Sequence, residues 1–408
     1  MNGPLLSNSR FVQLWIGQAA SFVGDAVSMV ALVVLIVQIT GSASAVGGAL
    51  VARLLPTLAS PFLGVLADRL DRRAILVASD LARALLAVGL IFARDLAVLY
   101  VLIFLMGAAR ALFNPTVRAA FPSVVGGGDL TRANSLISAT FSVSITVGPA
   151  LGGLLVAGIG VRAAFLLDAA TFLFSAALLY RIPLPRAESE SGEGFFTELR
   201  AGLGYLARAR VPLAMVAGAF LTVLATDLAT PAEVFLAKQT FGTGDTGYGL
   251  LVGVWGAGMV IGSACMGVLG DRVPLLPVYF VGLFAWALAF VGTGISPAFA
   301  AVLGALAVAG VANGIDNVVT DTVLQKRVPE ALLGRVFSVR FTGYSAAETL
   351  AYPLGGLFVD AFGPRPTYIV SGFATAGAGV LILLFLTPAL LARSNKSAPE
   401  DRPTNPGD

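Results

Sequence analysis

The segment Gly64–Arg69 reads GVLADR, and 203 residues later the segment Gly267–Arg272 reads GVLGDR. The same offset separates two LGGL segments, Leu151–Leu154 and Leu354–Leu357. It also relates Gly107 to Gly310, Asn114 to Asn317, Arg132 to Arg335 and Arg162 to Arg365. One constant offset across separated segments indicates a duplicated unit, so the sequence predicts two halves with the same fold.

The sequence around these repeats is strongly apolar. Of 408 residues, 57% are hydrophobic and 12% are charged, and the mean hydropathy is +0.87. A soluble domain carries about 25% charged residues, and a helix needs about 20 apolar residues to cross a bilayer. We therefore predict an all-α membrane protein with twelve transmembrane helices. They span about 11–39, 44–67, 74–93, 96–116, 133–158, 162–180, 212–237, 246–269, 275–294, 298–324, 334–359 and 365–391.

The lysines and arginines predict the orientation of these spans. With the N-terminus in the cytoplasm, 18 of the 26 lie on the cytoplasmic side and 4 on the other side. Because positive charge is retained in the cytoplasm, we expect both termini there.

The longest polar interruption divides the chain. We predict an N-terminal six-helix half at 1–180, a cytoplasmic linker at 181–211, a C-terminal six-helix half at 212–392 and a disordered cytoplasmic tail at 393–408. Within the linker, Pro183–Gly194 is expected to be flexible. The segment Phe195–Arg210 has the apolar periodicity of an amphipathic helix on the cytoplasmic membrane surface.

Several classes of function are excluded by what the sequence lacks. It has no histidine and one cysteine, Cys265, so we expect no metal site, no thiolate cluster and no Ser-His-Asp triad. Gly242–Gly247 matches the G-x-G-x-x-G pattern, but no strand precedes it, and no phosphate-binding Gly-Lys loop occurs. The net charge of +3 is scattered. We therefore predict no cofactor, no nucleic-acid partner and no enzyme activity.

Two repeated motifs predict moving parts. In the first motif, an acid is followed by arginine, and this occurs at the end of two predicted spans. It predicts a cytoplasmic gate that latches the two halves together. Its residues are Gly64, Asp68, Arg69, Arg72, Arg73, Asp271 and Arg272. The alternative is ordinary helix-end charge. A second motif allows close helix approach and bending, and we expect no substrate contact from it. Its residues are Gly148, Pro149, Gly152, Gly153, Pro353, Gly355 and Gly356.

Charged residues inside the predicted spans are the best candidates for function, because each is costly in a membrane. There are eight acids and four arginines. Asp25 and Arg53 both lie about 22 Å above the inner face, so we expect them to form a pair. Five others lie nearer the cytoplasm and predict a structural charge network: Asp80, Arg83, Arg110, Asp321 and Arg340.

The acids without an arginine at matching depth are candidates for proton coupling. A carboxyl group removed from water favours its neutral form and can take up and release a proton. The residues predicted for proton coupling or a substrate cavity are Asp25, Arg53, Asp227, Glu233, Asp316 and Glu348. The alternative is a hydrogen-bonded core acid or a solvated acid near a helix end.

Three segments resemble motifs of the major facilitator superfamily: Gly64–Arg73 (GVLADRLDRR), Gly148–Gly153 (GPALGG) and Pro329–Arg335 (PEALLGR). The resemblance extends over nearly the whole chain. It is strongest to the branch of drug:proton antiporters with the macrolide-efflux proteins and the enterobactin exporter. Asp71 departs from the glycine usual in the superfamily loop. Arg110 follows Gly107, whereas the superfamily arginine precedes its glycine.

The resemblance implies two pseudo-symmetric six-helix halves and a central cavity lined partly by the spans that carry Asp25, Asp227 and Asp316. It also implies proton-coupled export of amphipathic small molecules by alternating access, with drug, macrolide or siderophore-like substrates. We expect a monomer in the bacterial cytoplasmic membrane, with the lipid bilayer, protons and a small molecule as partners. Two alternatives stay open: a lipid or lysolipid translocase of the same fold, and a non-transporting membrane receptor or scaffold.

Overall fold

The computed structural model describes residues 5–59, 70–125, 130–184 and 195–394, and this part of the chain is helical without strands. Ten of its helices are long and apolar enough to cross a membrane. The two other predicted spans correspond to α2, whose described apolar stretch is Ala43–Leu58, and to α14, which is 33 residues long but carries several charges. The predicted all-α membrane fold is confirmed.

The first group of helices comprises α1 (Ser9–Thr40), α2 (Ala43–Leu54, extended by η2, Leu55–Ala59), α4 (Arg72–Phe92), α5 (Leu96–Val125), α6 (Leu130–Ile159) and α7 (Val161–Arg181). The second comprises α9 (Arg210–Thr226), η3 (Asp227–Ala229), α10 (Ala232–Phe235), η4 (Leu236–Thr240), α11 (Gly244–Leu269), α12 (Leu275–Ile295), α13 (Phe299–Arg327), α14 (Glu330–Phe362) and α15 (Pro364–Ser394). The short η1 (Leu5–Ser7), α8 (Phe195–Leu206) and η5 (Gly270–Arg272) complete the described elements.

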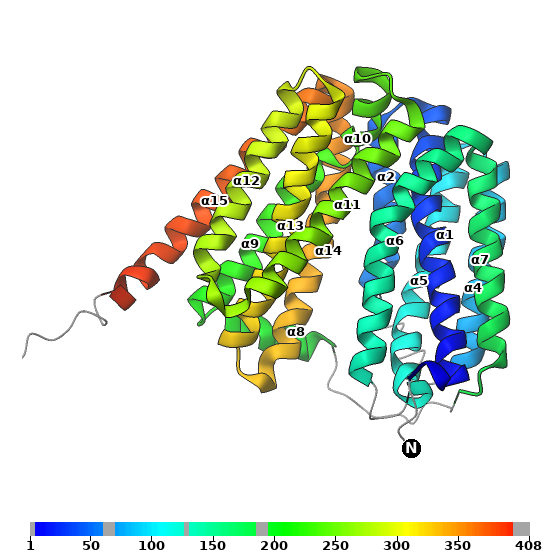
Figure 1. The fold of residues 1–408 in the computed structure, drawn as a ribbon, viewed down its shortest axis with the longest axis horizontal. Helices are drawn as coiled ribbons and strands as arrows, with labels where there is room; N and C mark the ends of the chain where they lie inside the picture. Colours follow the sequence, from blue (N-terminus) through cyan, green and yellow to red (C-terminus); the bar gives the residue numbers. More distant parts are fainter. Residues whose placement is uncertain (1–4, 60–69, 126–129, 185–194, 395–408) are drawn as a thin grey trace, which may run out of the picture.

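The two groups stand side by side and approach each other most closely toward one end (Figure 1). We call this the far end, where α1 ends at Thr40, and the opposite end, where α1 begins at Ser9, the near end. Across the boundary, α6 packs against α11 and α2 packs against α14. These two helix pairs hold the halves together.

Side-chain caps fix where several helices begin. Asn8 accepts hydrogen bonds from the backbone N–H groups of Arg10 and Phe11 at the start of α1. Asp71 accepts one from Ala74 at 2.9 Å at the start of α4. An aspartate can satisfy a free helical N–H and favour the helix dipole, whereas glycine at this position could not. The departure of Asp71 from the superfamily pattern therefore has a local structural role.

The predicted span at 212–237 is not one regular helix. It breaks after Thr226 into η3, the single turn α10 and the wide turn η4. Pro231 lies between η3 and α10 and cannot supply a backbone N–H. The expected bend is thus a break, and Asp227 lies at its start.

The amphipathic helix of the linker is present as α8, but its apolar face is partly covered by protein. Leu206 is buried and Leu199 packs against the same apolar cluster, whereas Leu203 is 51% exposed. A β-carbon at Gly202 would lie 2.7 Å from the backbone oxygen of Arg335 on α14. The helix therefore packs closely on the second half.

Candidate transport site

A cavity of about 630 Å³ lies between the two halves. This is a size suited to a drug-sized molecule. Its lining is mostly apolar and aromatic, with a few charged groups. The polar and aromatic lining residues are Phe22, Asp25, Arg53, Thr57, Arg110, Asn114, Phe141, Tyr248, Glu348 and Tyr352.

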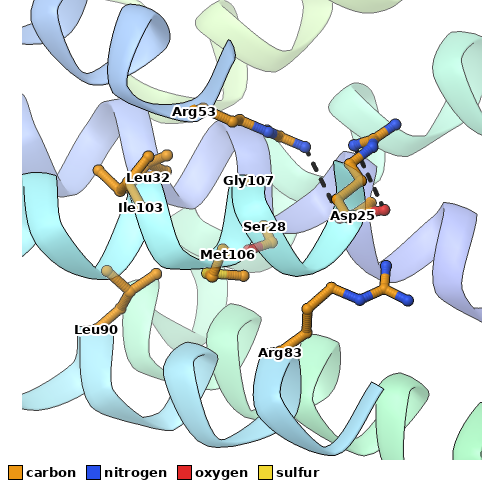
Figure 2. A pocket seen from close by; sticks show the side chains of 10 residues that line it. Asp25, Ser28, Leu32, Arg53, Arg83, Leu90, Ile103, Met106 and Gly107 are labelled. Atoms are coloured by element: carbon orange, nitrogen blue, oxygen red, sulfur yellow. Dashed lines mark ion pairs between the residues drawn. The ribbon is translucent and has the colours of Figure 1, made fainter. Parts of the chain in front are cut away.

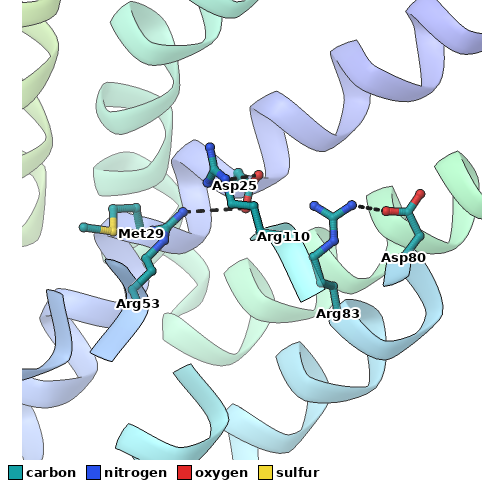
Figure 3. A network of polar contacts seen from close by, with 6 residues as sticks. All are labelled: Asp25, Met29, Arg53, Asp80, Arg83 and Arg110. Carbon is teal, nitrogen blue, oxygen red and sulfur yellow. Dashed lines mark hydrogen bonds and ion pairs between the residues drawn. The ribbon is translucent and has the colours of Figure 1, made fainter. Parts of the chain in front are cut away.

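One wall of the cavity carries an acid between two arginines (Figure 3). The carboxylate of Asp25 on α1 lies 3.7 Å from a guanidinium nitrogen of Arg53 on α2 and 3.7 Å from one of Arg110 on α5. The predicted pair between Asp25 and Arg53 is confirmed. Arg53 also lies against the sulfur of Met29. All three charged side chains are partly exposed, so the group faces the cavity rather than the core.

The placement of Arg110 in the network nearer the cytoplasm is wrong. The sequence predicts a span ending near 116, which puts Arg110 close to a helix end. In the structure α5 continues to Val125 through Pro115 and Pro122, so Arg110 lies at the middle of the helix and contacts Asp25.

A smaller pocket of about 30 Å³ lies behind this wall, inside the first half. Figure 2 shows Asp25 and Arg53 facing each other on one side of it and Leu90, Ile103 and Met106 on its apolar side. A space of this size holds a water molecule.

Asp80 and Arg83 are buried within the first half. The two side chains form an ion pair on α4 with almost no exposure (Figure 3). The guanidinium carbon of Arg83 lies 4.3 Å from the ring centroid of Phe113 and 4.4 Å from that of Phe172. The two rings and the acid stabilise the buried cation, so this pair belongs to the framework of the first half.

The opposite wall of the cavity carries one acid, Glu348. Glu348 on α14 lines it and accepts a hydrogen bond from the hydroxyl of Tyr352 at 3.2 Å. The carboxyl group of Asp227 interacts electrostatically with Glu348 and Glu233. Among the described residues, no arginine or lysine forms an ion pair with these three acids. The acids therefore repel one another unless protons or a bound cation intervene.

The structure separates the remaining candidates from the cavity. Asp316 on α13 is 8% exposed, and its Oδ1 has no hydrogen-bond partner among the described residues. Asp227, Glu233 and Asp316 are all absent from the cavity lining, so Glu348 is the one predicted second-half acid that lines it. Asp321 forms an ion pair with Arg340, as expected for a structural network.

Two glycines of the predicted motif, Gly153 and Gly356, lie at the boundary between the halves. A β-carbon at Gly153 on α6 would lie 2.7 Å from the backbone oxygen of Asp245 and 2.9 Å from the α-carbon of Gly249 on α11. One at Gly356 would lie 2.5 Å from the backbone oxygen of Ala43 on α2. The other three pack within one half: Gly148 against Ala26 and Gly152 against Val27 on α1, and Gly355 against Leu228 in η3.

These contacts explain why the motif needs residues without side chains. The two prolines lie inside their helices, Pro149 in α6 and Pro353 in α14. Pro149 lines the cavity, and the expectation that the motif makes no substrate contact stays a prediction.

The predicted gate motif is described only in part. Gly64, Asp68 and Arg69 lie outside the described residues, as does the side chain of Asp271, and Arg272 is exposed. Arg72 donates a hydrogen bond to the backbone oxygen of Ala119 at 3.2 Å. Arg73 lies over the ring of Tyr180. The latch itself therefore stays a prediction.

A second connection between the halves, absent from the sequence prediction, lies at the far end. Asp360, near the end of α14, accepts hydrogen bonds from the hydroxyl of Ser42 at 2.8 Å and from the backbone N–H groups of Ala43 at 2.6 Å and Ser44 at 3.0 Å. An acid of one half thus caps the first turn of a helix of the other half. We call this contact the far-end clasp.

Sequence reasoning also missed two cavity groups, Tyr352 and Asn114. Tyr352 follows Glu348 by four residues, a spacing that places both on one helix face, so this signal was available. Asn114 lies 203 residues before Asn317, which the repeat had already marked. Asp360 gives no local signal, because its partners are more than 300 residues away.

We expect removal of one member of the Asp25–Arg53 pair to cost more than removal of both. Arg53→Gln should lower the free energy of unfolding by about 1–3 kcal/mol, because it leaves Asp25 with only Arg110 in a partly buried place. Asp25→Asn combined with Arg53→Gln should recover part of that loss. Thermal unfolding of the single and double variants measures the coupling, and strictly additive effects would contradict the pairing.

Comparisons with known proteins identify the family and the fold. Macrolide efflux protein A of Streptococcus pyogenes is 24% identical over 390 residues, which cover 89% of this chain and 92% of the relative. The multidrug efflux pump Tap of Mycobacterium bovis is 29% identical over 402 residues, covering 93% and 94%. The inward-facing, unoccupied structure of a bacterial homologue of the lysosomal transporter Spinster has a TM-score of 0.74 at 16% identity and covers 98% of this chain and 100% of that one. This structural similarity shows a shared fold.

Fold and site together define a multi-pass membrane transporter of the major facilitator superfamily, rather than an enzyme. Within it the chain belongs to the transmembrane secretion effector family, which matches residues 3–403. The resemblance stated from the sequence motifs is thereby confirmed.

Proposed function

We propose that the protein exports amphipathic small molecules across the bacterial cytoplasmic membrane in exchange for protons. The observation that carries this proposal is the unequal charge of the two halves. The intramembrane acids and arginines of the first half are equal in number, and those of the second half are five acids and one arginine. The first set is Asp25, Asp80, Asp168, Arg53, Arg83 and Arg110, and the second is Asp227, Glu233, Asp316, Asp321, Glu348 and Arg340.

Excess acid in a membrane requires compensation by protons or by cationic substrate. Asp227 is the group that we assign to the coupling proton. It lies where the regular helix α9 stops, next to the break at Pro231, and α14 packs against this break at Gly355. Neutralising Asp227 reduces its repulsion with Glu348, so protonation would favour one arrangement of η3 and α14 over another.

We propose that alternating access arises because the two ends of the boundary between the halves open in turn. We propose that the near end faces the cytoplasm, because the excess of lysine and arginine lies there. The close contacts of α6 with α11 and of α2 with α14 lie in the far part of the boundary, at the glycine motif and the far-end clasp. The cavity would therefore receive substrate from the cytoplasm in this state, and opening of the far end would release it.

The far-end clasp gives a prediction for this cycle. Asp360→Asn should shift the equilibrium toward the state with an open far end by about three- to tenfold, because it removes a charge from three hydrogen bonds at an exposed site. Distances between spin labels on the far ends of α2 and α14, in a Cys265→Ser background, measure the shift.

Asp95→Asn is the matched control for the clasp. Asp95 caps α5 inside its own half through the N–H groups of Ala97 and Val98, so it also neutralises a helix-capping acid without touching the boundary. Equal populations in Asp360→Asn and Asp95→Asn would remove the clasp from the mechanism.

Uptake into inverted membrane vesicles tests the proposed function itself. An acidic lumen should drive accumulation of a fluorescent amphipathic dye, and a proton ionophore should abolish it. Accumulation that ignores the proton gradient would refute proton coupling. Gradient-independent movement of labelled lysolipid, with no dye transport, would instead establish the lipid translocase.

A further inference from the structure

The two walls of the cavity carry opposite charge. On the wall of the first half, one carboxylate faces two guanidinium groups, so Asp25, Arg53 and Arg110 together carry one excess positive charge. On the wall of the second half, Glu348 has no cationic partner among the described residues. A molecule in the cavity therefore lies between a surplus of positive charge and a negative group.

The arginines retain capacity to bind a ligand. Both contacts to Asp25 are 3.7 Å, which is longer than a hydrogen bond. Each guanidinium has five N–H donors, and the side chains of Arg53 and Arg110 are 25% and 31% exposed. An anionic group entering the cavity can thus form short charge-assisted hydrogen bonds without displacing Asp25.

The opposite wall suits a cation attached to an aromatic or apolar body. Glu348 offers carboxylate oxygens, and Tyr352 orients one of them through its hydroxyl. Tyr248 on α11 lines the cavity from the same half, whereas Phe22 and Phe141, whose rings meet edge to face at 5.1 Å, line it from the first half. Aromatic faces and a carboxylate attract organic cations together.

We infer that the preferred substrates are dipolar: amphipathic molecules with a cationic group at one end and a carboxylate at the other. The cation faces Glu348, and the carboxylate faces Arg53 and Arg110. This inference rests on the proposed function for the direction and driving force of transport, but the binding preference holds without any gradient.

Two dyes that differ only in the carboxylate test the inference. Rhodamine 110 has a free carboxylate and is a zwitterion, whereas rhodamine 123 is its methyl ester and is a cation. Fluorescence anisotropy with the purified full chain in lipid nanodiscs, without a gradient, gives both affinities. We expect the wild type to bind rhodamine 110 about tenfold more tightly, as one charge-assisted interaction would provide.

Variants assign the preference to the arginines. Arg110→Gln should reduce the preference to less than twofold while leaving rhodamine 123 binding intact, which also shows that the variant is folded. Arg110→Lys keeps the charge and should keep most of the preference. Arg118→Gln, an exposed arginine on the same helix, is the control and should bind like the wild type. Glu348→Gln should weaken both dyes.

Three results would overturn the inference: equal or tighter binding of the ester, a preference that survives Arg110→Gln, or no binding of either dye. Failure of the proposed function looks different, because the preference for rhodamine 110 would persist in nanodiscs while an acidic vesicle lumen failed to drive uptake of the dye.

Discussion

Asp227→Asn should bind substrate and exchange it between compartments at near wild-type rates, yet fail to accumulate it against a gradient. A pH difference of one unit supplies about 1.4 kcal/mol per proton, which sustains about a tenfold concentration ratio. Asparagine keeps the shape of the side chain but cannot carry the proton. We therefore expect the accumulation ratio in acid-loaded vesicles to fall from about ten to about one.

Glu233→Gln is the comparison for this variant. Glu233 lies on α10, on the other side of Pro231 from Asp227, and neither of the two acids lines the cavity. We expect it to retain uphill uptake. If Asp227→Asn keeps the wild-type accumulation ratio and pH profile, Asp227 does not carry the coupling proton.

Gly153→Ala should prevent the two halves from closing at the far end. The added methyl group would lie 2.7 Å from the oxygen of Asp245 and 2.9 Å from the α-carbon of Gly249, and both contacts are with backbone atoms that cannot rotate away. Overpacking of this kind costs about 1–3 kcal/mol. We expect transport to fall by about tenfold or more, together with a longer spin-label distance between the far ends of α6 and α11.

Gly158→Ala is the matched control on the same helix. Nothing lies within 4 Å of a β-carbon at Gly158, so the substitution should be neutral or slightly stabilising, because alanine favours a helix by about 1 kcal/mol over glycine. Wild-type transport by Gly153→Ala would show that the contact between α6 and α11 is not part of the cycle.

Sequence reasoning predicted the features that depend on composition and periodicity. Apolar runs predicted the helices, and the 203-residue repeat predicted two related halves. Asp25 and Arg53 were predicted to pair because the fixed rise of a helix places both at the same depth in neighbouring antiparallel spans. Small residues at repeated places predicted close helix contacts, and Gly153 and Gly356 are at such contacts.

The features that it missed depend on tertiary contact. The predicted span ended near residue 116, but α5 continues to Val125, which places Arg110 at the middle of the helix and in the cavity wall. Asp360 reaches Ser42 and Ala43 only because the two halves fold against each other. An exposed acid near a helix end carries no sequence signal for such a partner.

Proton movement that depends on substrate tests the central proposal most directly. Purified protein is reconstituted into liposomes with a pH-sensitive dye inside and an acidic lumen, and rhodamine 110 is then added outside. Export coupled to protons predicts that the lumen becomes more alkaline as the dye enters, and that Asp227→Asn abolishes this change while dye exchange continues. Dye entry through the wild-type protein with no change in lumenal pH would contradict the account.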